Sequence, residues 1–164
     1  MSVARCLGYV CAALAFSLAV SGCNRETRDT DIRIISVSEA KNLFDRANRG
    51  EPGIALFLDP RPAAEFNTGH IPGARNFTLA QIKPTARVDP RIDRFKNLVV
   101  YGDNPASATA RGLTKRLIAV GYDDVRFFAG GIEEWSGRGY PVSTVPTPEP
   151  EEPGRPGQDA PASP

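Results

Sequence analysis

The sequence predicts an α/β fold, a single domain in which a parallel sheet carries helices on both faces. Apolar stretches of strand length alternate with amphipathic stretches of helical length over about 110 residues, which is the pattern of successive strand–helix units. The strand-length stretches are apolar throughout, as in a sheet that is covered on both sides. At 164 residues, with 41% hydrophobic and 24% charged residues, the chain has room for one such domain and polar extensions.

The stretch "ISVSEAKNLFDRANRG" predicts the first helix. Ser36 and Glu39 have the spacing of a capping box, and Gly50 is a stop signal. The apolar residues between them recur on one helical face: Val37, Ala40, Leu43, Phe44 and Ala47.

Three apolar runs predict buried strands: Ile54–Asp59, Leu98–Tyr101 and Val125–Gly131. A second long helix is predicted after Leu98–Tyr101 and ends at Gly121, and "GGIEEW" opens a short closing helix. The apolar residues of the second long helix recur at spacings of three and four: Ala106, Ala110, Leu113, Leu117 and Val120.

The first 22 residues have the pattern of a secretory signal, because Arg5 precedes an apolar run from Leu7 to Val20 that is short for a membrane-spanning helix. The end of this segment, "LAVSGC", resembles the lipobox of bacterial lipoproteins. That resemblance implies export, lipidation (palmitate) of Cys23 and attachment to a bacterial cell membrane. Asn24 after the cysteine is compatible with the outer membrane. A simple signal peptide and a retained anchor helix are the alternatives.

The three cysteines are Cys6, Cys11 and Cys23. Cleavage before Cys23 removes two of them and acylation blocks the third, so the mature chain is expected to have no disulfide, no thiolate zinc site and no cysteine nucleophile. His70 is the only histidine and cannot form a metal site alone. We therefore expect neither a metal nor another cofactor, and the formal charge of +1 without a Lys/Arg block argues against nucleic acid as a partner.

Polar extensions flank the predicted domain, which spans residues 32–142. Residues 23–31 are expected to form a polar linker. Residues 143–164 hold seven prolines and four acidic residues against one arginine, a composition typical of a disordered tail. A proline-motif ligand is the alternative for this tail.

Three separated motifs resemble a rhodanese domain, in the order and at the spacing of that family. They are "FLDPRPAAEFNTGHIPGARN", "NLVVYG" and "GYDDVRFFAGGIEEWSGRGYPV". The resemblance implies about five parallel strands, with an active loop between the fourth strand and the following helix. It also implies that Asp59 and Arg61 lie beside this loop and order it.

Active rhodaneses carry a cysteine at the end of that strand, and its thiolate accepts sulfur from thiosulfate. The matching residue here is Gly102, and Ser107 stands where active relatives often have an arginine. The sequence "NP" favours a helix start at Asn104, which would shorten the loop. Asp103 would oppose a bound anion. The degenerate loop comprises Gly102, Asp103, Asn104, Pro105, Ala106 and Ser107.

These residues predict a membrane-tethered rhodanese-like domain with no catalytic residue of its own, used as a binding or scaffold module for a protein partner. A hydroxyl of Ser107 or Thr109 is a far weaker nucleophile than a thiolate at neutral pH. The alternatives are a sulfurtransferase that uses a thiol of its partner, and an enzyme that processes phosphate or sulfur anions by unusual chemistry.

Overall fold

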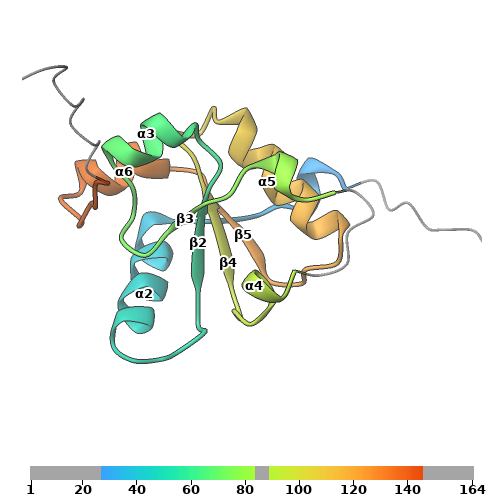
Figure 1. Ribbon diagram of the computed structural model, residues 1–164, viewed down its shortest axis with the longest axis horizontal. Coiled ribbons are helices and arrows are strands. Elements are labelled where there is room, and N and C mark those ends of the chain that lie inside the picture. The colour runs from blue at the N-terminus through green and yellow to red at the C-terminus, as the bar shows by residue number, and fades with distance from the viewer. Residues whose placement is uncertain (1–26, 84–88, 146–164) are drawn as a thin grey trace, which may run out of the picture.

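The structure, a computed structural model, describes residues 27–83 and 89–145 and contains one sheet of five parallel strands (Figure 1). The order in the sheet is β1-β5-β4-β2-β3, so β4 is central. The predicted parallel α/β fold is confirmed. The strands are β1 (Arg33–Ile35), β2 (Leu56–Asp59), β3 (Arg75–Asn76), β4 (Leu98–Tyr101) and β5 (Val125–Phe128).

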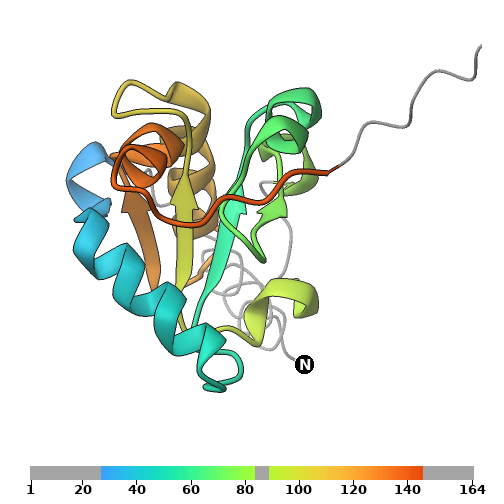
Figure 2. The same cartoon turned by 90° about the vertical axis from the view of Figure 1, so that its left-hand side faces the viewer.

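Helices cover both faces of this sheet (Figure 2). α2 and α6 pack on one face, and α5 packs on the other together with α4 and η3. The helical segments are η2 (Asp29–Asp31), α2 (Val37–Asn48), α3 (Ala63–Thr68), η3 (Leu79–Gln81), α4 (Pro90–Asp93), α5 (Ala108–Ala119) and α6 (Gly131–Gly137).

The two faces of the sheet have different cores. On the face of α2 and α6 the core is aromatic, with Trp135 fully buried among Phe44, Phe57, Phe128 and Tyr140. The core under α5 is mainly aliphatic and includes Leu58, Val100, Leu113 and Leu117. Because each large buried side chain contributes about 1.5–3 kcal/mol, the two cores together hold the sheet between its helices.

Helix α2 begins and ends where local sequence signals place it. The side chain of Ser36 accepts a hydrogen bond from the Glu39 backbone N–H, and Glu39 reciprocates to the Ser36 backbone N–H, which confirms the predicted capping box. Gly50 follows with a φ of 91°, a conformation that glycine adopts without strain. This helix starts directly after β1 and packs on one face of the sheet.

The start of α5 differs from the sequence prediction. The helix begins at Ala108 with Ser107 as its N-cap, and Ala106 is exposed in a turn. Asn104 does not cap the helix because its side-chain oxygen accepts a hydrogen bond from Ala106 N at 3.0 Å, which stabilises a turn before the helix. The six residues from Gly102 to Ser107 therefore remain a loop.

The C-terminal boundary of the domain also differs from the prediction. Ser143, expected to begin the disordered tail, pairs with His70 through both backbone hydrogen bonds, at 2.8 and 2.9 Å. Val145 N donates a further bond to Asn67 O. The folded part therefore extends to Val145, because these backbone groups are satisfied by the loop after α3.

The extensions of the chain lie largely outside the described residues. This applies to the predicted signal peptide, to Cys23, to the start of the linker and to residues 146–164. The last part of the predicted linker forms η2, which is joined to α5 by an ion pair between Asp29 and Lys115 at 2.6 Å. Within residues 27–83 and 89–145, no helix is both long and apolar enough to cross a membrane.

Truncation after Val145 should leave the thermal stability unchanged, whereas truncation after Val142 should lower it. The longer deletion removes the pairing partner of His70, and each lost backbone hydrogen bond costs about 0.5–1.5 kcal/mol. Thermal melts of the two truncated chains beside the full chain measure the difference. Equal melting temperatures for both truncations would show that this pairing contributes nothing to stability.

Candidate functional site: the loop after strand β4

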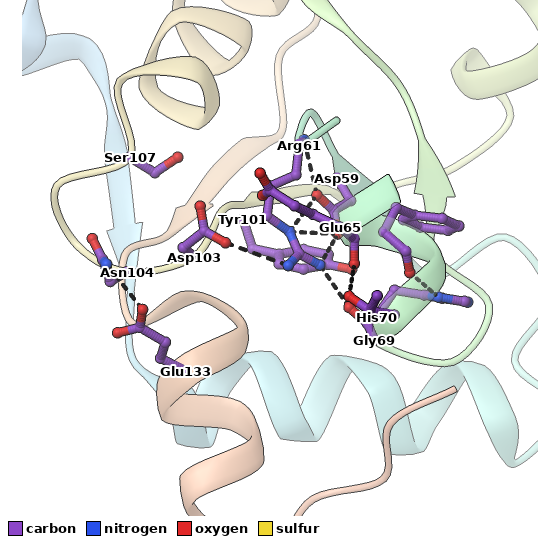
Figure 3. A network of polar contacts seen from close by, with 12 residues as sticks. Asp59, Arg61, Glu65, Gly69, His70, Tyr101, Asp103, Asn104, Ser107 and Glu133 are labelled. Atoms are coloured by element: carbon purple, nitrogen blue, oxygen red, sulfur yellow. Dashed lines mark hydrogen bonds and ion pairs between the residues drawn. The ribbon is translucent and has the colours of Figure 1, made fainter. Parts of the chain in front are cut away.

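The loop Gly102–Ser107 lies at the carboxyl edge of the sheet, between the central strand β4 and helix α5 (Figure 3). The neighbouring strands β2 and β5 end on either side of it, at Asp59 and Phe128. Ligands of parallel α/β sheets bind at this edge. The topology therefore brings the predicted loop and the predicted supporting pair, Asp59 and Arg61, to one place.

Arg61 is the centre of the polar network at this edge. Its side chain is 6% exposed and makes a bidentate ion pair with the fully buried carboxylate of Asp59, with Nη2–Oδ2 at 2.7 Å and Nε–Oδ1 at 3.0 Å. Nη2 also donates to Gly69 O at 2.7 Å, and Nη1 lies 3.3 Å from Asp103 Oδ1 (Figure 3). Burial lowers the pKa of Arg61, but hydrogen bonding to Asp59 together with the nearby charges of Asp59 and Asp103 outweighs this effect and raises the pKa above its usual value.

Tyr101, the last residue of β4, is a second buried polar group beneath the loop. Its hydroxyl oxygen accepts a hydrogen bond from the backbone N–H of Ile71 at 3.1 Å. Burial and the nearby charge of Asp59 raise the pKa of Tyr101 well above its ordinary value. The hydroxyl thus stays neutral and connects β4 to the segment that follows α3.

The start of α6 holds the loop from the other side. Backbone N–H groups of Ile132 and Glu133 donate to the carbonyl oxygens of Gly102 and Asp103, at 2.9 and 3.0 Å. The side chain of Asn104 donates to Glu133 Oε1 at 3.0 Å (Figure 3). These bonds use donors of the α6 N-terminus that would otherwise be free to bind an anion.

Gly131 is required by this close packing. Its φ is 62°, and a Cβ at this position would lie 2.5 Å from Gly102 O, closer than real Cβ atoms approach a backbone oxygen. Gly131, the first residue of α6, therefore makes room for the loop. Sequence reasoning did not find this contact because the two segments are distant in the chain.

The space in front of Gly102 is filled by the end of the loop itself. A Cβ on Gly102 would lie 2.5 Å from Ser107 Cβ, closer still to Ser107 Oγ, and 3.2 Å from Ala110 Cβ. Ser107 occupies this position because it caps α5, accepting a hydrogen bond from Ala110 N. The loop keeps its six residues, but its interior at Gly102 holds the Ser107 side chain.

Two charged residues near the loop were not predicted from the sequence. Arg111 reaches back from α5 to donate to Pro105 O at 3.3 Å, and its guanidinium lies over the Phe127 ring at 5.1 Å. Glu133 bonds Asn104 from α6. Neither spacing is a local signal: six residues separate Arg111 from Pro105, and 29 separate Glu133 from Asn104.

His70 lies beside this network, and its contacts are those of a residue that stabilises the fold. It is buried and stacked on Phe66 with ring centroids 3.9 Å apart, and its Nδ1 contacts Phe66 O at 2.9 Å. Its backbone pairs with Ser143. The side chain thus fixes the turn after α3, the same turn whose Gly69 carbonyl binds Arg61.

The comparisons with known proteins agree with this architecture. The rhodanese-like domain family model matches residues 36–138. The chain belongs to the rhodanese-like domain family. Thiosulfate sulfurtransferase 18 of Arabidopsis thaliana is 29% identical over 127 residues, which cover 72% of this chain and 88% of that protein. The uncharacterized protein YqhL of Bacillus subtilis is 30% identical over 98 residues, which cover 60% of this chain and 74% of YqhL.

Solved structures share the fold of this rhodanese-like domain. The BH2092 protein of Bacillus halodurans has a TM-score of 0.55 at 21% identity, covering 69% of this chain and 77% of that one. A thiosulfate sulfurtransferase from Pseudomonas aeruginosa has a TM-score of 0.54 at 20% identity, covering 72% of this chain and 21% of that one. At these identities the likeness shows the fold.

The loop of this rhodanese-like domain presents a preformed surface. Asp103 is bonded through its side chain to Arg61 and through its carbonyl to α6, and Asn104 is bonded to Glu133. The carboxylate of Asp103 lies 3.3 Å from the guanidinium of Arg61, which also makes the ion pair with Asp59. Because its groups are already paired, the loop can contact a partner without first being ordered.

Proposed function

We propose that this rhodanese-like domain is a membrane-tethered binding or scaffold module without sulfurtransferase activity. The observation that carries the proposal is the filled space at Gly102. Where active relatives present a thiolate, this chain has a glycine, and the position that a cysteine Cβ would need is taken by Ser107. The sequence holds no cysteine after Cys23, so no neighbouring residue supplies a thiol.

The charges at the loop support the same conclusion. Sulfur transfer from thiosulfate needs a cradle of donors for a dianion. Beside this loop the Arg61 guanidinium is bound to Asp59, Gly69 O and Asp103, and the carboxylate of Asp103 repels an incoming anion. The related proteins named as thiosulfate sulfurtransferases share the rhodanese-like fold with this chain. We propose that the present chain uses this fold for binding.

The full chain should show no thiosulfate-to-cyanide sulfur transfer above the uncatalysed rate. The reason is that the reaction passes through a cysteine persulfide, which this domain cannot form. A colorimetric thiocyanate assay beside an active rhodanese measures this, and a mass spectrum after thiosulfate treatment detects any sulfur adduct. Turnover by the chain alone, or an added sulfur on it, would contradict the proposal.

The membrane tether depends on Cys23, and Cys23→Ser should abolish it. A lipid on this residue is proposed from the "LAVSGC" segment, and acyl chains provide about 0.8 kcal/mol of membrane affinity per buried CH₂. Detergent partitioning and intact mass of the exported chain compare the two forms. Unchanged mass and partitioning in the serine variant would exclude this anchor while leaving the conclusion about Gly102 intact.

A further inference from the structure

The most exposed large apolar side chain of the described residues lies on an edge strand. Ile34 in β1 is 58% exposed, against 38% for Leu79, 41% for Val142 and 43% for Val145. β1 has a neighbour on one side only, β5, and is three residues long. β1 is too short to be an open edge for strand pairing, so Ile34 offers its surroundings an apolar side chain rather than a strand edge.

Ile34 is also close to the proposed lipid anchor along the chain. Thr27, the first described residue, follows Cys23 by four residues, so the tether spans at most about 14 Å at 3.3–3.6 Å per residue. A compact domain of this size is roughly 35 Å across. The chain enters the fold through η2 and is buried by Ile32, two residues before Ile34. The short tether therefore holds the β1 edge near the membrane.

The other end of the domain points away from this edge. Figures 1 and 2 both show η2 on one side of the molecule and α3, with the end of the described chain at Val145, on the opposite side. An arrangement with the β1 edge toward the membrane therefore places α3 and Val145 on the side of the domain far from the bilayer.

Most charged side chains around the β1 edge have an oppositely charged neighbour, and Arg28 and Asp31 add one exposed charge of each sign. Lys115 bonds Asp29 at 2.6 Å, and Asp124 lies 3.7 Å from Arg33 and 3.5 Å from Arg126. Because Asp124 is shared by two arginines, these groups leave a small net positive charge, and anionic lipid attracts this edge only weakly. Its approach to the bilayer is then set by the tether and by the apolar side chain, and it should be insensitive to salt.

We propose that the β1 edge, comprising η2 and β1 with Ile34 at its centre, rests on the surface of the bilayer that holds the Cys23 lipid. This inference rests on the proposed anchor and adds an orientation to it. The loop Gly102–Ser107, at the carboxyl edge of the sheet, then lies to the side of the domain and is open to a partner. α3 and Val145 face away from the membrane.

Single-cysteine labelling tests this orientation, since the sequence after Cys23 has no cysteine. A fluorophore is placed at Ile34→Cys or Ala64→Cys in the full lipidated chain, bound to phosphatidylcholine vesicles that contain a headgroup-attached quencher. Ala64 is exposed in α3. We expect at least about twofold stronger quenching at position 34, because contact is confined to the roughly 5–10 Å interfacial layer. The ratio should persist in high salt.

Co-sedimentation with vesicles separates the two proposals. If the chain sediments with vesicles and Cys23→Ser does not, the anchor is present, and equal quenching or stronger quenching at position 64 then overturns the orientation alone. If the chain fails to sediment, both the anchor and the orientation are overturned. Asp31→Cys, an exposed position in η2, provides a second label at the β1 edge, and we expect it to be quenched like position 34.

Discussion

Replacing Arg61 by methionine is expected to lower the free energy of unfolding by about 3–5 kcal/mol. The change keeps an apolar stem but leaves the fully buried carboxylate of Asp59 without its partner, and an uncompensated buried charge costs about this much. It also removes the bonds to Gly69 O and Asp103. Because small domains have about 5–15 kcal/mol of stability, urea unfolding should show a large shift in midpoint.

Arg46→Met is the matched control for this loss. Arg46 also makes an ion pair, with Glu51 at 2.7 Å, but both side chains are well exposed, at 38% and 47%. An exposed pair of this kind contributes about 0–1 kcal/mol. Similar losses for the two variants would show that burial of the Asp59–Arg61 pair is not what makes it important.

Gly102→Cys is expected to destabilise the domain by about 1–3 kcal/mol and to leave sulfur transfer feeble. The new Cβ overlaps Ser107, so α5 or the loop must shift, and overpacking a dense site costs about this amount. A thiolate added there still faces the carboxylate of Asp103. Thermal melts, thiol alkylation and the thiocyanate assay follow the three consequences separately.

Two further variants identify the cause of that loss. Gly112→Cys adds a thiol on α5 where the nearest atom to the new Cβ is 3.9 Å away, and it should cost nothing. Ser107→Gly removes both atoms that overlap the new side chain, and glycine in place of serine at an N-cap costs only a few tenths of a kcal/mol. Adding it to Gly102→Cys should therefore restore stability. Robust turnover by Gly102→Cys alone would refute the proposal that the loop interior is filled.

Elements with strong local signals were predicted from the sequence. α2 has its capping box and one apolar face, and the three central strands β2, β4 and β5 are continuous apolar runs. The edge strands β1 and β3 were expected only through the family resemblance, because three and two residues carry no usable periodicity. They are strands because their neighbours in the sheet offer hydrogen-bond partners.

The start of α5 shows how tertiary contacts override a local preference. Asn104 followed by Pro105 is a good helix start in isolation. In the structure the Asn104 side chain bonds Ala106 N and Glu133 of α6, and Ser107 takes the N-cap position. The pair is therefore used in the turn, because α6 supplies a partner that no local pattern reveals.

The sequence by itself determined the fold class, the absence of a cysteine after position 23 and the glycine at the end of the fourth strand. These follow from residue identity and from periodicity along the chain. Only the tertiary structure decided that Ser107 fills the space in front of Gly102 and that Asp103 lies on Arg61. Arg61 and Asp103 are 42 residues apart in the chain, and they meet because β2 and β4 are hydrogen-bonded neighbours whose carboxyl ends share one edge of the sheet.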